Sequence, residues 1–220
     1  ALSPAFQQTF AVSVADIGVL IGLYFAPGMF LAAPGGALGR RYGDKRLVLT
    51  GLALMTVGGT MMVISELWVG QLAGRLIAGA GGVLLNVLMT KMVADWFTGK
   101  EITFSLAIYV NSYPVGIGAA LILLPFVAEV GGLAAALTVV AVLTLVGFIG
   151  LAMFYRPPSE LSDAPVAARA PMRGTLMGAV LAAGAIWGIY NAALATVFSF
   201  GPGLFVVRGL GMTEAGSVTS

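Results

Sequence analysis

Arg75 is the side chain whose type and position most strongly indicate chemistry, because it is the one charged residue inside six long apolar stretches. A cation in the middle of a membrane costs about 2.5–3.5 kcal/mol, and such groups usually face a partner or a watery cavity. Arg75 lies roughly eight residues, or ~12 Å, into its stretch. It is therefore predicted to face a partner group or a watery cavity inside the protein. The alternative is a side chain that extends to the nearby membrane surface.

A second candidate group lies near the middle of the last apolar stretch. Trp187, Tyr190 and Asn191 stand at positions i, i+3 and i+4, so they share one face of a helix. The two rings could stack on a flat ligand and the amide could hydrogen-bond it. Asn86 and Asn111, in earlier stretches, are further candidates. For all five residues, an ordinary polar contact between helices is the alternative.

Pro114 and Gly116 predict a hinge in the fourth apolar stretch. Proline inside a helix frees a carbonyl group and bends the axis. Glycine two positions later adds backbone freedom at the same level.

Catalytic and cofactor chemistry is poorly represented. The sequence has no Cys and no His, which excludes thiol catalysis, imidazole bases and most transition-metal sites within these residues. The apolar stretches contain no pair of carboxylates for acid–base hydrolysis. The glycines of segment 79–82 follow no strand, so a phosphate-binding loop is not expected. We expect no enzyme activity, no cofactor and no metal, since an intramembrane enzyme would need catalytic residues outside this stretch.

Composition indicates a lipid environment. Hydrophobic residues make up 59% of the 220 positions and charged residues 9%, and the mean hydropathy is +1.01. A soluble domain carries ~25% charged residues. The net charge is +2, but the basic residues lie in short turns and form no stripe for a phosphate backbone, so nucleic acid is excluded as a partner.

Six stretches are long enough to span a bilayer as helices, which takes about 20 mostly apolar residues. They do not alternate polar and apolar positions, as the strands of a membrane barrel do. The sequence therefore predicts an all-α membrane protein with the lipid bilayer as its main partner. The predicted spans are 17–38, 47–65, 67–90, 102–128, 130–155 and 174–200.

The distribution of basic residues predicts the orientation. Nine fall on one side of the predicted spans: Arg40, Arg41, Lys45, Arg46, Lys91, Lys100, Arg156, Arg169 and Arg173. Arg208 alone falls on the other side. Because short cytoplasmic loops are enriched in Lys and Arg, the first side is predicted to be cytoplasmic. We expect a multi-pass protein of a bacterial inner membrane.

The domain organisation follows from a proline-rich segment and a faint repeat. Segment 156–173 predicts a cytoplasmic linker, with five spans in residues 1–155 and one in 174–220. Similar residues recur 198 positions apart, at Pro4 and Pro202 and again at Asp16 and Glu214. In this repeat the last span is the counterpart of a helix that is expected to precede Ala1. We therefore expect an incomplete N-terminal bundle and the start of a C-terminal bundle, six spans of twelve, with the remainder of the polypeptide missing.

The turn after the first span, 36–46, resembles the loop between spans two and three of the major facilitator superfamily, whose pattern is Gly-x-Leu-x-Asp-Arg-x-Gly-Arg-Arg/Lys. The matching residues are Gly36, Leu38, Arg41, Gly43 and Lys45. Arg40 stands where the family has Asp, and Asp44 where it has Arg. The resemblance implies a gating motif whose acid takes part in a charge cluster that locks one conformation. Here the acid is displaced, and Asp44 could rebuild the cluster with Arg40 or Arg41. A generic basic loop is the alternative.

Further resemblances lie in the later spans. Arg75 followed by Gly79 and Gly81 is similar to the family's span-four motif, in which the Arg serves proton coupling or substrate charge. Glycines and alanine at four-residue spacing predict a close helix contact there: Gly70, Gly74, Ala78 and Gly82. The Gly-Pro pair of antiporters is absent. Segments 88–97 and 110–116 resemble the cyanate and nitroimidazole branch.

The resemblance implies secondary active transport of a small solute by alternating access, in a helical bundle of the major facilitator type. The solute would be anionic if Arg75 binds it, and protons would be a second partner in a symporter. A membrane sensor that binds solute without moving it is the alternative function.

Overall fold

The computed structural model describes residues 2–97, 101–157 and 174–219, and every regular element in these ranges is a helix. The all-α fold predicted from the sequence is confirmed. The helices are α1 (Ser3–Phe10), α2 (Val14–Tyr42), α3 (Asp44–Ile64), α4 (Trp68–Trp96), α5 (Ile102–Phe154), α6 (Thr175–Val207) and α7 (Met212–Thr219). Five of them, α2 to α6, are long and apolar enough to cross a membrane.

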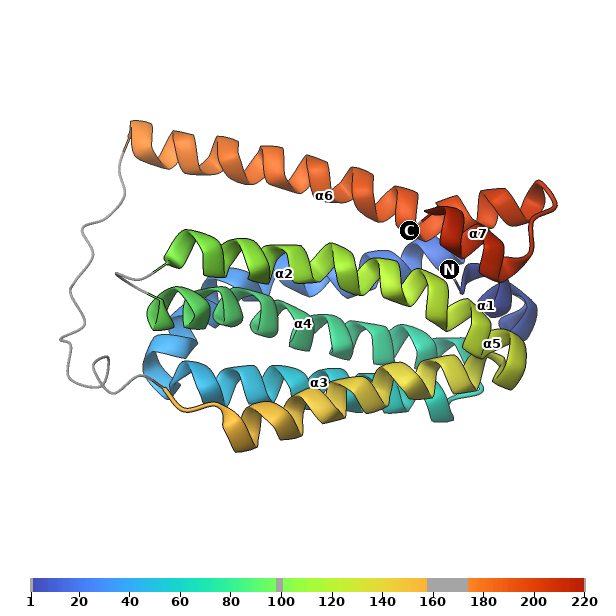
Figure 1. Cartoon of the computed structure of the whole chain (residues 1–220), viewed down its shortest axis with the longest axis horizontal. Helices are drawn as coiled ribbons and strands as arrows, with labels where there is room; N and C mark the ends of the chain where they lie inside the picture. The colour runs from blue at the N-terminus through green and yellow to red at the C-terminus, as the bar shows by residue number, and fades with distance from the viewer. Residues whose placement is uncertain (1, 98–100, 158–173, 220) are drawn as a thin grey trace.

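Helix α5 holds two spans in its 53 residues. Figure 1 shows its second half folding back beside α3. The break lies at Gly132, where φ is 76° and ψ is 178°. Only glycine adopts such angles readily. The sequence places this boundary at residue 129, since Glu129 is the polar residue there, but the backbone turns three positions later.

Local sequence explains where α2 begins and ends. Its start is a capping box: the Ser13 N–H donates to Asp16 Oδ2 at 2.9 Å, and the Asp16 N–H donates to Ser13 Oγ at 3.2 Å. Its end is set by Gly43, whose φ of 89° breaks the helix before α3 begins at Asp44. The predicted gating motif, residues 36–46, therefore lies mostly within α2 and α3, and Gly43 is its one residue outside a helix.

Helices α3 and α4 pack at van der Waals distance of their backbones. A Cβ on Gly51 would lie 2.7 Å from the Gly81 carbonyl oxygen, and one on Gly74 would lie 2.7 Å from the Gly58 carbonyl oxygen. Real Cβ atoms do not approach so closely, so glycine is required at these positions.

The predicted seam on α4 divides between two neighbours. Gly74 and Ala78 face α3 at Gly58, whereas Gly82 faces Tyr24 of α2. Four residues advance a helix by 400°, so a four-residue spacing drifts about 40° at each step. Gly82, the last member of the series, therefore meets a different helix from Gly74 and Ala78.

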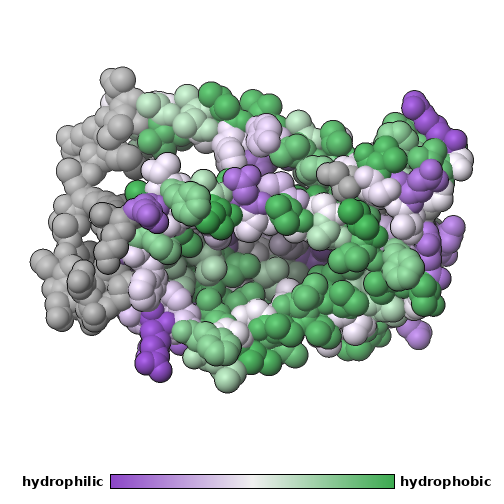
Figure 2. All heavy atoms as spheres, in the orientation of Figure 1, coloured by the Kyte–Doolittle hydropathy of each residue, from purple (hydrophilic) through white to green (hydrophobic). Residues whose placement is uncertain are grey.

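The two ends of the bundle differ. The basic end carries the α2–α3 turn and the ends of α4 and α5, and the opposite end carries α1, α7 and the turn within α5 (Figure 1). Helix α6 packs on α7 and α1 at the opposite end. Residues 177–190, its half toward the basic end, are all exposed. In the face of the molecule that Figure 2 shows, mostly apolar side chains cover the middle, with strongly hydrophilic ones toward the two ends.

The structure adds two features at the repeat spacing of 198. Helices α2 and α7 begin at Val14 and Met212, which are 198 positions apart. The positive-φ residues Ala11 and Gly209, just before them, have the same spacing. Both support the internal repeat. The predicted linker lies outside the described residues from position 158 onward.

Candidate functional site

Arg75 of α4 lies against an aromatic ring of α2. Its guanidinium carbon is 4.8 Å from the centroid of Tyr24, a distance typical of a cation–π contact. Its Nε atom is buried and has no hydrogen-bond partner among the described residues. Arg75 as a whole is partly exposed, and its Nε donor is left without a partner inside the bundle.

Two glycines of α4 create the seat for Tyr24. A Cβ on Gly82 would lie 2.6 Å from the Tyr24 hydroxyl oxygen and 3.1 Å from its Cζ atom, and one on Gly79 would collide with the Tyr24 backbone. The glycines after Arg75 thus let α2 approach closely enough to cover the cation, and both α2 and α4 contribute to this site.

The two asparagines do not join this site through any hydrogen bond of the described residues. The Asn111 Nδ2 atom donates to the carbonyl oxygen of Ala107 at 2.8 Å, within its own helix. Asn86 is exposed, and its backbone carbonyl accepts a hydrogen bond from the Thr90 hydroxyl at 2.8 Å. Their predicted contact with a ligand stays a prediction.

The aromatic pair of α6 is present as expected from its spacing. The rings of Trp187 and Tyr190 have centroids 5.8 Å apart at an interplanar angle of 36°. They are 61% and 54% exposed. The Asn191 Nδ2 atom donates to the Trp187 carbonyl oxygen at 2.8 Å. The face of α6 that carries these residues is thus accessible, and the structure does not place it against Arg75.

The predicted hinge shows no break in this conformation. Pro114 and Gly116 lie inside α5 and are exposed. A Cβ on Gly116 would meet nothing within 4 Å. The non-helical residue of α5 is Gly132, so the hinge stays a prediction.

Charged residues meet at the basic end. Lys91 of α4 forms an ion pair with Asp44 at the start of α3 and another, 3.2 Å long, with Asp95 one turn further on. The side chains of Asp44 and Lys91 are 16% and 40% exposed. The Asp44 Oδ1 atom is buried without a hydrogen-bond partner among the described residues. Asp44 therefore ties α3 to α4.

The expected pairing of Asp44 with Arg40 or Arg41 is wrong. Both arginines are exposed at the end of α2, and the Arg41 guanidinium lies 5.4 Å from the ring centroid of Tyr42. Asp44 instead faces the crossing of α2 and α4, where a Cβ on Gly39 would lie 2.5 Å from its Oδ1 atom.

The remaining residues of the gating motif have structural roles here. Gly36 packs at the α2–α4 contact, where a Cβ would lie 3.9 Å from Val87, and Leu38 is exposed. The Lys45 ammonium donates to the carbonyl oxygens of Ala152 and Tyr155 at 3.0 and 2.7 Å, at the end of α5.

Tyr155 lies just beyond α5 at the same end. Its side chain packs against the apolar cluster that includes Leu88 and Met92 of α4, while its carbonyl group accepts a hydrogen bond from Lys45.

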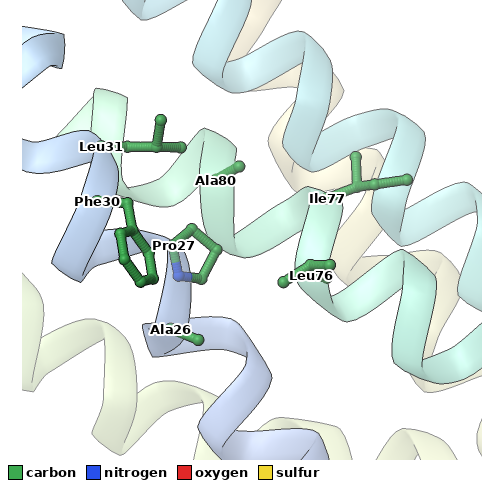
Figure 3. Close-up of a pocket in the computed structure, with 7 residues that line it drawn as sticks. All are labelled: Ala26, Pro27, Phe30, Leu31, Leu76, Ile77 and Ala80. Carbon is green, nitrogen blue, oxygen red and sulfur yellow. The ribbon is translucent and has the colours of Figure 1, made fainter.

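An apolar groove of about 390 Å³ lies between α2 and α4. Figure 3 shows its lining, which comes from both helices: Ala26, Pro27, Phe30, Leu31, Leu76, Ile77 and Ala80. No polar side chain lines it, so it lacks the groups that orient a small polar solute.

The sequence matches the model of the Major Facilitator Superfamily over residues 1–220. The chain belongs to the major facilitator superfamily. The fold described above is accordingly part of a facilitator bundle, and the protein is a multi-pass membrane protein. Membership in a family of transporters favours a transporter over an intramembrane enzyme.

Several facilitator relatives are known by name. "Protein spinster homolog 3" of Danio rerio is 30% identical over 129 residues, covering 57% of this chain and 26% of the relative. "Inner membrane transport protein YajR" of Escherichia coli is 29% identical over 148 residues, covering 67% and 32%. "Protein spinster homolog 1" of Homo sapiens is 28% identical over 118 residues, covering 52% and 22%. The matched part is thus a third or less of each of these relatives. The cyanate and nitroimidazole branch is not confirmed.

Two residues that contact the predicted site residues, Tyr24 at Arg75 and Lys91 at Asp44, are not among the candidates from the sequence. Tyr24 carries no motif of its own, but the small residues Gly79 and Gly82 indicate that something must approach α4 there. Lys91 stands four residues before Asp95, a spacing that favours an ion pair on one helix. Its second partner, Asp44, is 47 positions away and follows only from the packing of α3 on α4.

Proposed function

We propose that this facilitator is a secondary active transporter that moves a small anionic solute by alternating access. The single observation that carries the proposal is the Arg75 cation, held by Tyr24 inside the bundle with its buried Nε atom unpaired. A buried charge without a counter-charge is costly. A solute anion that supplies the missing partner would therefore bind there with a favourable free energy.

The ion pairs of the described residues support this assignment. Both involve Lys91 at the basic end, so no carboxylate within the described residues neutralises Arg75. A guanidinium also offers paired donors that match a carboxylate or phosphate edge. We therefore favour an oxyanion over a neutral solute.

The arrangement of α6 supports alternating access. Its half toward the basic end, 177–190, is exposed all round, while its other half joins α7 and α1. The aromatic pair Trp187 and Tyr190 lies at the boundary of these halves. In the proposed cycle these rings contact the solute from the second bundle while Arg75 holds it from the first. Binding would then draw the two bundles together.

The location follows from the distribution of charge. We propose that the basic end lies in the cytoplasm and that the membrane is a bacterial inner membrane, in agreement with the name of the Escherichia coli relative. Symport with protons is the proposed mode, since co-transported protons would compensate the solute's negative charge.

A transport assay with the purified full-length protein reconstituted in liposomes tests the proposal. With an inward proton gradient, a panel of labelled carboxylates and phosphates should contain at least one solute that accumulates. Replacement Arg75→Gln should abolish accumulation, and Arg75→Lys should retain part of it. Arg208→Gln, which removes a cation after α6, is the matched control. Saturable binding without accumulation would instead favour the sensor, and activity equal to the wild type in Arg75→Gln would refute the anion site.

A further inference from the structure

Lys45 makes a contact that the transport site does not use. It is the second residue of α3, and its ammonium group donates to two carbonyl oxygens more than 100 positions further along the chain. These belong to Ala152, at 3.0 Å, and Tyr155, at 2.7 Å. Both hydrogen bonds are partly buried. One side chain therefore bridges the start of α3 and the end of α5.

The chemistry of a helix end explains why a lysine binds there. The last four carbonyl groups of a helix have no partner within it and carry the negative end of the helix dipole. An ammonium group offers three donors without a fixed geometry, so it can hold two such carbonyls at once. Lys45 thus acts as a cap for α5 that is supplied by another helix.

The neighbouring residues make this cap part of a larger junction. Asp44, one position earlier, binds Lys91 of α4. Tyr155 packs against the apolar cluster that includes Leu88 and Met92 of α4. The first two residues of α3 are thus attached to α4 and α5, and the ends of α4 and α5 are in contact with each other.

The next residue provides an internal comparison. Arg46 carries the same charge and directly follows Lys45, but it is exposed, and its side chain forms no hydrogen bond or ion pair with the described residues. The basic character of the turn alone therefore does not explain the contact with α5.

We propose that Lys45 is a positioning residue that couples the α2–α3 turn to the end of α5, from which the chain leads to α6. When the turn moves, the end of α5 moves with it, so a change at the gating motif is passed to the connection between the two bundles. The contact itself does not depend on the proposed transport function. The role in transport rests on that function.

Hydrogen exchange of the protein in lipid nanodiscs tests the contact. Lys45→Met removes the donor and keeps the length of the side chain. It should raise amide exchange in residues 151–157 by about tenfold through local opening. Exchange in the body of α3 should not change. Lys45→Arg, which can still donate to both carbonyls, should restore protection, and Arg46→Met is the matched control. Equal exchange in Lys45→Met and Arg46→Met would overturn the proposal.

Transport kinetics test the coupling. Lys45→Met should lower the maximal rate per folded protein severalfold and leave the half-saturating solute concentration unchanged, because Arg75 is intact. Lys45→Arg should recover the rate. Faster exchange with an unchanged rate would overturn the coupling. If the wild-type protein transports nothing, the proposed function fails, while the exchange experiment still decides whether Lys45 holds α5.

Discussion

The two ends of this bundle are held together by different chemistry. At the basic end, charged side chains join α3 to α4 and α5 through Asp44, Lys91 and Lys45. At the opposite end, small residues let α7 lie directly on α5: Ala215 is fully buried, and Gly216 touches the Leu121 carbonyl group. Charges thus bind helices within the first bundle, whereas close packing joins it to the chain after α6.

The difference teaches how one end can open while the other stays closed. Backbone contacts at glycine are short and leave no room for intervening atoms. The contact between α7 and α5 is therefore either fully formed or fully lost. The half of α6 toward the basic end has no such contact. In the proposed transport cycle, this structure corresponds to a state that is open at the basic end.

The largest effect is expected from breaking the packed end. In Gly216→Val the new side chain would collide with the Leu121 carbonyl group and the Pro125 ring, so α7 should lift from α5. Overpacking of this kind costs about 1–3 kcal/mol. An Ala215→Cys reporter, in a chain without other cysteines, should then react with a maleimide about 5- to 160-fold faster.

Gly211→Val is the control for that experiment. Nothing lies within 4 Å of a Cβ at Gly211, and the residue does not have a positive φ. If Gly216→Val and Gly211→Val left the reporter equally protected, the packed contact would not be what closes this end.

A smaller effect is expected from breaking the charged end. Lys91→Met leaves the partly buried carboxylate of Asp44 without its cation, which should cost about 0.5–1.5 kcal/mol, because the Lys91 side chain is 40% exposed to screening. Asp44→Asn should cost less, and the double variant should recover part of the loss. Thermal unfolding in detergent would measure this cycle.

Arg40→Met serves as the control, because Arg40 is exposed and forms no ion pair among the described residues. Strictly additive effects of Lys91→Met and Asp44→Asn would mean that the ion pair contributes nothing. The charged end would then be held by apolar packing alone.

The smallest effect is expected from Glu129, which adds a polar contact to the packed end. Its Oε1 atom accepts a hydrogen bond from the Thr213 N–H at the start of α7, at 3.1 Å. A carboxylate at a helix N-terminus contributes about 0.3–1 kcal/mol. Glu129→Gln should therefore raise labelling of Ala215→Cys no more than about fivefold. Glu66→Gln, at an exposed turn of the same end, should leave it unchanged, and an effect of Glu129→Gln as large as that of Gly216→Val would contradict this ranking.

The sequence predicts the helices more accurately than it predicts the contacts between them. Apolar length alone indicates the helices, because membrane helices satisfy their backbone internally and need no partner to be recognised. The start of α7 was not predicted as a helix, since Met212–Thr219 is short and only its repeat spacing from α2 marks it. The sequence indicates the turn in α5 at Glu129, because polarity is visible in a sequence, whereas the backbone angle that Gly132 adopts is not.

The candidate site shows the same division. Arg75 is conspicuous because a charge in an apolar stretch needs an explanation, but its cover, Tyr24, is one of several aromatic residues with no distinguishing neighbour. Asp44 was recognised as displaced in its motif, yet its partner is the distant Lys91 instead of a nearby arginine. Pairings between helices depend on rotation about each axis, which spacing along one helix does not determine.

Labelling of single cysteines in intact cells tests the central claim most directly, that the helices cross a bilayer with the basic end inside. The chain has no cysteine, and both Tyr42 at the basic end and Glu66 at the opposite end are exposed. An impermeant maleimide should label Glu66→Cys from outside and Tyr42→Cys only after the membrane is opened. Labelling of Tyr42→Cys in sealed cells would contradict the proposed orientation and the transport cycle built on it.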